Sequence, residues 1–165
     1  MEKAWFKRIK YEEWQKGKYE PLAIIKYSAE ELSERYKLEF EIAEEDGLGT
    51  IKEARCITCL GNQFALIQYL QSPEPYKTMT NVIGLYDVST MTQQLEHILE
   101  LLNLSLSELI WISPKIHFLP YELWRQDDNG VKYLIGVFPN KLDALKSLQE
   151  FESFHHKQTY WLQLH

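Results

Sequence analysis

The C-terminal run from Trp124 to Trp161 limits the possible folds more than any other part of the chain. It combines a polar turn with apolar runs that have strand or helix periodicity. The expected elements are a strand over 120–126, a turn, a strand over 131–138, a helix over 141–153 that Asn140 caps, and a strand over 158–164. This order predicts a ββαβ unit at the end of the chain.

Chain geometry should bring the two polar ends of this unit together. A strand over 131–138 is about 26 Å long, and a helix over 141–153 is about 20 Å long. Because the helix runs back along the strand, the segment after the helix returns to the turn. The sequence therefore predicts one cluster of polar side chains, made of Arg125, Asp127, Asp128, His155, His156 and Lys157.

This cluster has three interpretations. Two carboxylates and two imidazoles could bind a divalent metal or carry out acid–base catalysis. Arg125, Lys157 and protonated histidines could instead hold an anion. The favoured interpretation is structural, because Asn129-Gly130 is typical of a hairpin turn and cations complement the dipole at a helix C-terminus. An ion pair there would contribute only about 0–1 kcal/mol.

Parts of this run resemble a module of small uncharacterised bacterial proteins. The residues that carry the resemblance are Arg125-Gln126-Asp127-Asp128-Asn129-Gly130 and His156-Lys157-Gln158-Thr159-Tyr160-Trp161. It covers residues 120–164 and implies no activity. The ββαβ order is also similar in outline to part of the peptidoglycan-binding sporulation-related repeat domain, by analogy of architecture alone. The charged N-terminal residues do not resemble a secretion signal, which argues against that analogy.

The rest of the chain predicts short strands and two helices. Ser28 and Glu31 form a capping box for a helix that ends near Tyr36, and Ser89 is a plausible N-cap for a helix over 90–102. The apolar stripe of that second helix is Met91, Leu95, Ile98, Leu99 and Leu102. Strands are expected over 22–27, 38–42, 51–60, 63–71, 81–88 and 109–112, with a tight turn at Gly61-Asn62. Residues 2–19 predict a short helix or an irregular arm.

These elements predict an α+β protein with a mostly antiparallel sheet and two or three packed helices. The chain of 165 residues fits a single compact domain. The alternative is an α+β unit over 1–115 with a docked module over 118–165.

An acidic strand and turn form the second candidate site. Leu38, Phe40 and Ile42 alternate with glutamates, which predicts a half-buried strand with an acidic outer face. The acidic residues are Glu39, Glu41, Glu44, Glu45 and Asp46. They form either a solvated surface or a docking surface that attracts a basic protein electrostatically.

Composition and motifs argue against several classes of protein. The net charge is −6 with no basic patch, which disfavours nucleic-acid binding. No apolar run is long enough to span a membrane, and two cysteines are too few for a disulfide scaffold. The Cys56-to-Cys59 motif has strand-like flanks, which predicts a buried or incidental role for the cysteines rather than a redox role. Residues 95–112 offer no base-reading side chains for a helix-turn-helix, and the common catalytic motifs are missing.

The leading interpretation is a non-enzymatic binding or interaction protein of the bacterial cytoplasm, with no metal or cofactor. Its partner would be a basic protein or a small ligand, and it would bind neither nucleic acid nor membrane. The alternative is an enzyme or metal-dependent site built from Asp127, Asp128 and residues 155–157. The sequence leaves the oligomeric state open.

Overall fold

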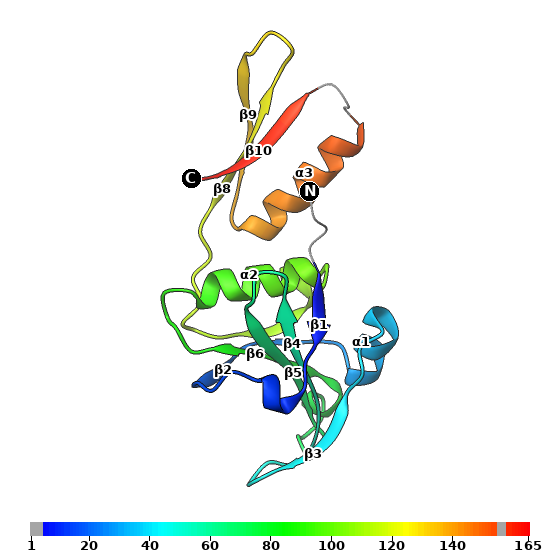
Figure 1. Cartoon of the computed structure of the whole chain (residues 1–165). Helices are drawn as coiled ribbons and strands as arrows, with labels where there is room; N and C mark the ends of the chain where they lie inside the picture. Colours follow the sequence, from blue (N-terminus) through cyan, green and yellow to red (C-terminus); the bar gives the residue numbers. More distant parts are fainter. Residues whose placement is uncertain (1–4, 155–157) are drawn as a thin grey trace. The chain divides into compact units, whose positions relative to one another are not determined.

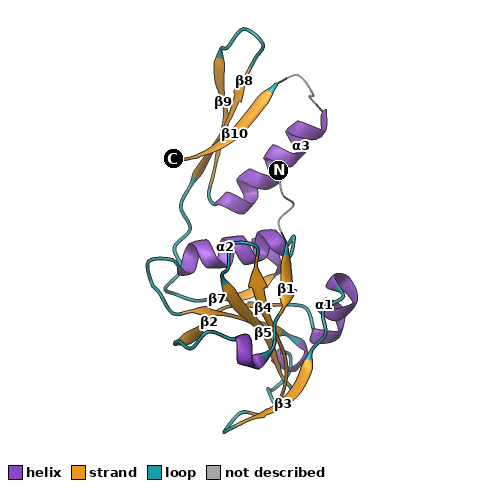
Figure 2. Ribbon diagram, viewed as in Figure 1, coloured by secondary structure: helices purple, strands orange, loops and turns teal. Residues whose placement is uncertain are grey.

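The computed structural model describes residues 5–154 and 158–165. The chain forms two compact units, Met1–Ile116 and His117–His165, which are shown in Figures 1 and 2. The predicted α+β class is confirmed, with three α-helices and ten strands in the described part of the chain. All strand pairs in the two sheets are antiparallel. No helix within these residues is both long and apolar enough to cross a membrane.

The first unit is built on a seven-stranded sheet. Its strands are β1 (Phe6–Arg8), β2 (Tyr19–Ile25), β3 (Glu41–Glu45), β4 (Gly49–Thr58), β5 (Gln63–Tyr69), β6 (Thr80–Leu85) and β7 (Leu109–Ile112). They follow the order β1-β4-β5-β6-β2-β7, and β3 also pairs with β4. Because β1 lies opposite residues 56–58 of β4 and β3 lies opposite residues 49–53, the two short strands share one edge of β4.

Two α-helices belong to this unit, α1 (Ala29–Tyr36) and α2 (Met91–Leu101), together with three short 3₁₀ segments, η1 (Tyr11–Glu13), η2 (Tyr76–Thr78) and η3 (Leu106–Glu108). The predicted capping box of α1 is confirmed. The Ser28 hydroxyl accepts a hydrogen bond from the Glu31 N–H group, and the Glu31 carboxylate accepts one from the Ser28 N–H group. The apolar stripe predicted for α2 is buried along its whole length.

The N-cap predicted for α2 is wrong, and of the two alternatives for the N-terminal arm the α-helix is wrong. The N-cap of α2 is Thr90 rather than Ser89, because the Asp87 carboxylate accepts hydrogen bonds from both the backbone and the hydroxyl of Ser89. The N-terminal arm contains strand β1 and the 3₁₀ segment η1, not an α-helix. Pairing with β4 and packing of the Phe6 ring on Phe64, at 5.7 Å between ring centroids, favour the strand.

Side-chain hydrogen bonds attach the helices to the sheet. Gln94 of α2 donates to the carbonyl of Leu85 and accepts from its N–H group, both at 3.1 Å. Gln68 of β5 accepts from the backbone of Ala29, the first residue of α1, at 2.7 Å. Each bond fixes a polar side chain that would otherwise be costly to bury, so the orientation of both helices is specified by polar as well as apolar contacts.

The segment 105–108 connects α2 to β7. Glu108 accepts hydrogen bonds from the Tyr27 hydroxyl and, at 2.8 Å, from the Ser105 backbone. Burial opposes ionisation of Glu108, but these hydrogen bonds outweigh it and hold the pKa of the carboxyl below its usual value. The Ser105–Glu108 capping box therefore forms, but it caps η3, which is followed by a strand and not by a second helix.

The second unit contains β8 (Tyr121–Gln126), β9 (Lys132–Phe138), α3 (Lys141–Phe154) and β10 (Thr159–Leu164). Its three strands have the order β10-β8-β9, and α3 contacts all three of them. Leu123 and Ala144 are fully buried, and the Phe151 ring of α3 lies 5.9 Å from that of Tyr160. Asn140 accepts a hydrogen bond from the backbone of Asp143 at 2.9 Å, as expected for the cap of α3.

Candidate functional site

The acidic hairpin consists of β3, the turn at 45–49 and the first half of β4. Figure 1 shows it extending as an arm from the first unit. The register pairs Glu41 with Glu53 and Glu45 with Gly49, and the Leu48 N–H group donates to the Glu45 carbonyl at 3.0 Å. The predicted candidates Glu39, Glu41, Glu44 and Glu45 are all exposed and lie on this arm or immediately before it.

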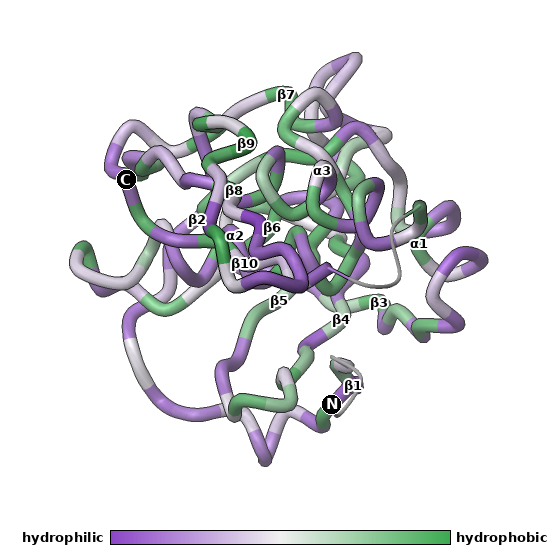
Figure 3. The backbone as a smooth tube through the Cα atoms, turned by 90° about the horizontal axis from the view of Figure 1, so that it is seen from above, coloured by the Kyte–Doolittle hydropathy of each residue, from purple (hydrophilic) through white to green (hydrophobic). Residues whose placement is uncertain are grey.

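The two faces of β3 carry different side chains. Because side chains alternate along a strand, Glu41, Ala43 and Glu45 lie on one face, and Ile42 and Glu44 lie on the other. Ile42 is 71% exposed. Figure 3 shows this part of the chain as a short hydrophobic stretch between hydrophilic residues. Ile42 therefore adds an exposed apolar surface to the face of β3 that also carries Glu44.

The prediction that Ile42 faces the interior is wrong. Leu38 is buried and Phe40 is half-buried, but the strand begins only at Glu41. From that point β3 is an edge strand whose Ile42 side faces an open groove beside α1, so the alternation continues without a packed core beneath it. The alternation predicted a strand over 38–42, but β3 runs from Glu41 to Glu45. The pattern therefore gave neither the bounds of the strand nor the position where the core ends.

The negative charge of the hairpin is partly neutralised. Arg8 of β1 forms ion pairs with Glu39, at 3.3 Å, and with Glu41. The Glu44 carboxylate accepts a hydrogen bond from the Thr50 hydroxyl at 2.6 Å. Glu44, Glu45 and Asp46 form no ion pair with any of the residues that the structure describes. Unneutralised charge is therefore concentrated at the tip of the arm.

A groove of about 330 Å³ lies between α1 and β3. Ala29, Phe40 and Ile42 supply its apolar surface, and Glu30 and Glu34 lie on the α1 side. Lys52 also lines the groove and forms an ion pair with Glu30. No pattern in the sequence predicted this groove. Phe40 and Ile42 are apolar residues that could line a groove, but only the structure shows that they face a gap beside α1.

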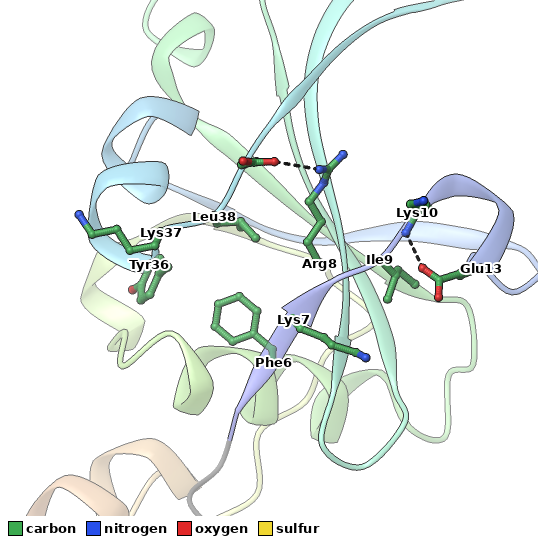
Figure 4. Close-up of a pocket in the computed structure, with 10 residues that line it drawn as sticks. Phe6, Lys7, Arg8, Ile9, Lys10, Glu13, Tyr36, Lys37 and Leu38 are labelled. Carbon is green, nitrogen blue, oxygen red and sulfur yellow. Dashed lines mark hydrogen bonds and ion pairs between the residues drawn. The ribbon is translucent and has the colours of Figure 1, made fainter.

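A larger pocket of about 620 Å³ lies where β1 meets the end of α1 (Figure 4). The rings of Phe6 and Tyr36 lie edge to face there, with 6.0 Å between centroids. Arg8 lines this pocket, but its guanidinium already donates hydrogen bonds to Glu39 and Glu41 at the base of the hairpin. The pocket therefore marks the position where β1 anchors the acidic hairpin.

The turn of the second unit uses its predicted site residues for folding. One Asp127 carboxylate oxygen accepts hydrogen bonds from the backbone of Asn129, at 3.0 Å, and of Val131, at 2.9 Å. Gly130 has φ 80°, and its N–H group donates to the Asp127 carbonyl. Asn129 does not have a positive φ, so Asn129-Gly130 is not the two-residue type I′ turn typical of a hairpin but part of a longer turn that ends in a left-handed glycine.

The remaining residues of the predicted polar cluster do not add evidence for a metal or catalytic site there. Asp128 is exposed, and the Arg125 guanidinium lies 4.8 Å from the centre of the Tyr133 ring. His155, His156 and Lys157 lie outside the described residues. Within residues 5–154 and 158–165, no three His, Cys, Asp or Glu side chains are grouped as metal ligands. The metal or catalytic site at 125–128 and 155–157 stays a hypothesis.

The two cysteines occupy different environments. Cys56 is fully buried in β4, whereas Cys59 is exposed in the turn after it. Burial raises the pKa of the Cys56 thiol to about 12, although Arg8 lowers it slightly. The pair forms no disulfide. A thiol with such a high pKa is a poor nucleophile at neutral pH.

Comparisons with protein-family models, with curated proteins and with solved structures gave no match for this chain. The resemblance of the C-terminal strings to a bacterial module therefore stays a prediction.

Proposed function

We propose that this protein is a non-enzymatic interaction protein that binds a basic partner at the acidic hairpin. The observation that carries the proposal is the tip of that hairpin, where Glu44, Glu45 and Asp46 are exposed without an ion pair in the described part of the chain and follow the exposed Ile42 by two to four residues. Carboxylates held on an extended arm steer a cationic partner into contact. An apolar side chain among them contributes affinity that charge alone does not give.

A binding measurement with a simple cationic probe tests this function. The probe is fluorescently labelled deca-lysine, and its anisotropy is followed on titration with the full chain at low and at moderate salt. The expected result is binding that weakens as salt increases, because the charges at the tip are exposed and screened. Reversing Glu44 and Glu45 to lysine should weaken binding at low salt about tenfold, which is about 1.4 kcal/mol.

The matched control carries the same net charge. Glu12 and Glu152 are exposed and lie outside the hairpin, so Glu12→Lys with Glu152→Lys changes the total charge of the chain by the same amount. This control should bind deca-lysine within about twofold of the wild type. Equal losses in both double variants would show that only net charge matters, and no binding at low salt would also reject the proposal.

A further inference from the structure

We infer that the partner docks as an extended strand along the free edge of β3 and inserts one apolar side chain into the groove between α1 and β3. This inference rests on the proposed function and specifies the partner more closely. Three observations carry it: the free edge of β3, the exposed apolar groove beside it, and the order of side chains along β3.

The edge of β3 is open to strand addition. Among the described strands, β3 pairs only with β4, so its other side presents backbone N–H and C=O groups without sheet partners. An added strand forms main-chain hydrogen bonds with such an edge, and its alternate side chains give specificity. Since both sheets of this protein are antiparallel, we take the added strand to run antiparallel to β3.

The groove offers the apolar contact. Phe40 lies half-buried in it, and Ile42 is 71% exposed at its margin. The opposite wall comes from Glu30, Ser33 and Glu34, which are three and four residues apart and therefore share one face of α1. An aliphatic side chain in this space would cover Ile42 and Phe40 together.

The charges of the groove favour a cationic neighbour for that side chain. Lys52 already pairs with Glu30. Glu34 has no ion pair with the described residues and keeps its charge at the rim. Glu44 lies on the same face of β3 as Ile42, two residues further along. An apolar residue flanked by basic residues therefore matches both the groove and its rim.

The order of side chains along β3 predicts the order in the partner. Residues directly opposite each other in a sheet lie on the same face, so the partner should place basic residues opposite Glu45 and Glu44 and an apolar residue opposite Ile42. Any residue type could stand opposite Ala43. Glu41 already forms an ion pair with Arg8, so it requires no basic residue opposite it. Read antiparallel, the partner carries the pattern basic-basic-x-apolar.

The experiment uses two capped peptides with the same charge, Gly-Lys-Lys-Thr-Ile-Thr-Gly and Gly-Lys-Lys-Thr-Ser-Thr-Gly, titrated into the full chain and followed by NMR. The isoleucine peptide should bind at least threefold more tightly than the serine peptide and should shift the amide resonances of β3. In the Ile42→Ser variant this difference should disappear. Ile42 is exposed, so the Ile42→Ser variant should fold. A second variant in the groove, Glu34→Gln, should weaken the binding of both peptides.

The possible outcomes separate this inference from the proposed function. If the two peptides bind equally, or if neither binds while deca-lysine still binds at Glu44 and Glu45, the docking mode is wrong and the acidic surface stands. If deca-lysine binding does not depend on Glu44 and Glu45 either, the proposed function fails as well. A difference between the peptides that persists in Ile42→Ser would place the apolar contact elsewhere and overturn the inference.

Discussion

Gln68 connects the sheet to the helix that forms one wall of the groove. Its side-chain oxygen accepts a hydrogen bond from the Ala29 N–H group, and its side-chain nitrogen donates to the Lys77 carbonyl, both at 2.7 Å. The first N–H groups of a helix have no partner within the helix. Ser28 satisfies the N–H group of Glu31, and Gln68 satisfies that of Ala29. The position of α1 therefore depends on one buried amide of β5.

The substitution Gln68→Met removes both hydrogen bonds while keeping a side chain of similar size, so the cavity contribution is small. Ala29 is 1% exposed, and its unpaired N–H group costs about 1–3 kcal/mol. Lys77 is exposed, so water can replace Gln68 at its carbonyl, and only the net value of that bond is lost, about 0.5–1.5 kcal/mol. Together we expect the first unit to lose about 1.5–4.5 kcal/mol of unfolding free energy.

Amide hydrogen exchange measures both the global and the local effect. The slowest amides of β5 report the stability of the first unit, and the Ala29 amide reports the start of α1. The matched control is Gln93→Met, because Gln93 is an exposed residue of α2 and should change stability by less than about 0.5 kcal/mol. If Gln68→Met stays within 0.5 kcal/mol of this control, or if the Ala29 amide keeps its protection, the assigned role of Gln68 is incorrect.

Three further predictions concern other parts of the chain. Under native conditions at neutral pH, iodoacetamide should label Cys59 and leave Cys56 unlabelled, which mass spectrometry will show; rapid double labelling would contradict the buried thiol. Gly130→Ala should destabilise the second unit by about 1–2 kcal/mol, because φ at Gly130 is 80°, whereas Gly136→Ala, without a positive φ, should cost less than 0.5 kcal/mol in urea unfolding. The pKa of Glu108 is lowered in the folded chain, so its contribution is present at neutral pH and is lost as pH falls through and below the usual value of 4.5. The stability difference between wild type and Glu108→Gln should accordingly shrink on acidification, and a constant difference would exclude this linkage.

Local signals in the sequence predicted most of the elements. The Ser28–Glu31 capping box depends on residues three positions apart, so its geometry is available before any tertiary contact is known. The stripe from Met91 to Leu102 predicted the buried face of α2 because helix periodicity alone places those residues together. The antiparallel pairs around Gly61 follow from a short turn between two apolar runs. In each case the information lies within one element or one turn.

Features that depend on distant partners were not predictable in this way. β1 is a strand because β4 offers an edge about fifty residues away, and nothing within residues 6–8 signals that partner. The exposure of Ile42 depends on the open groove between β3 and α1, which no pattern within residues 38–42 indicates. Asp127 was a candidate ligand because carboxylates bind metals, but its carboxylate closes the turn by accepting two backbone hydrogen bonds. Tertiary context thus decides whether a polar residue in a turn is free to react.

The shared edge of β4 explains why charge is distributed unevenly along the acidic hairpin. Because β1 ends where β3 begins, Arg8 reaches Glu39 and Glu41 at the base of the arm. Glu45 lies four residues further along, about 14 Å at 3.4 Å per residue, which exceeds the screening length of about 8 Å at physiological salt. The cation at the base therefore does little to neutralise the tip. A basic segment that approaches the arm is attracted first by the tip and only then meets Ile42, so its cationic residues should precede its apolar residue in an antiparallel strand.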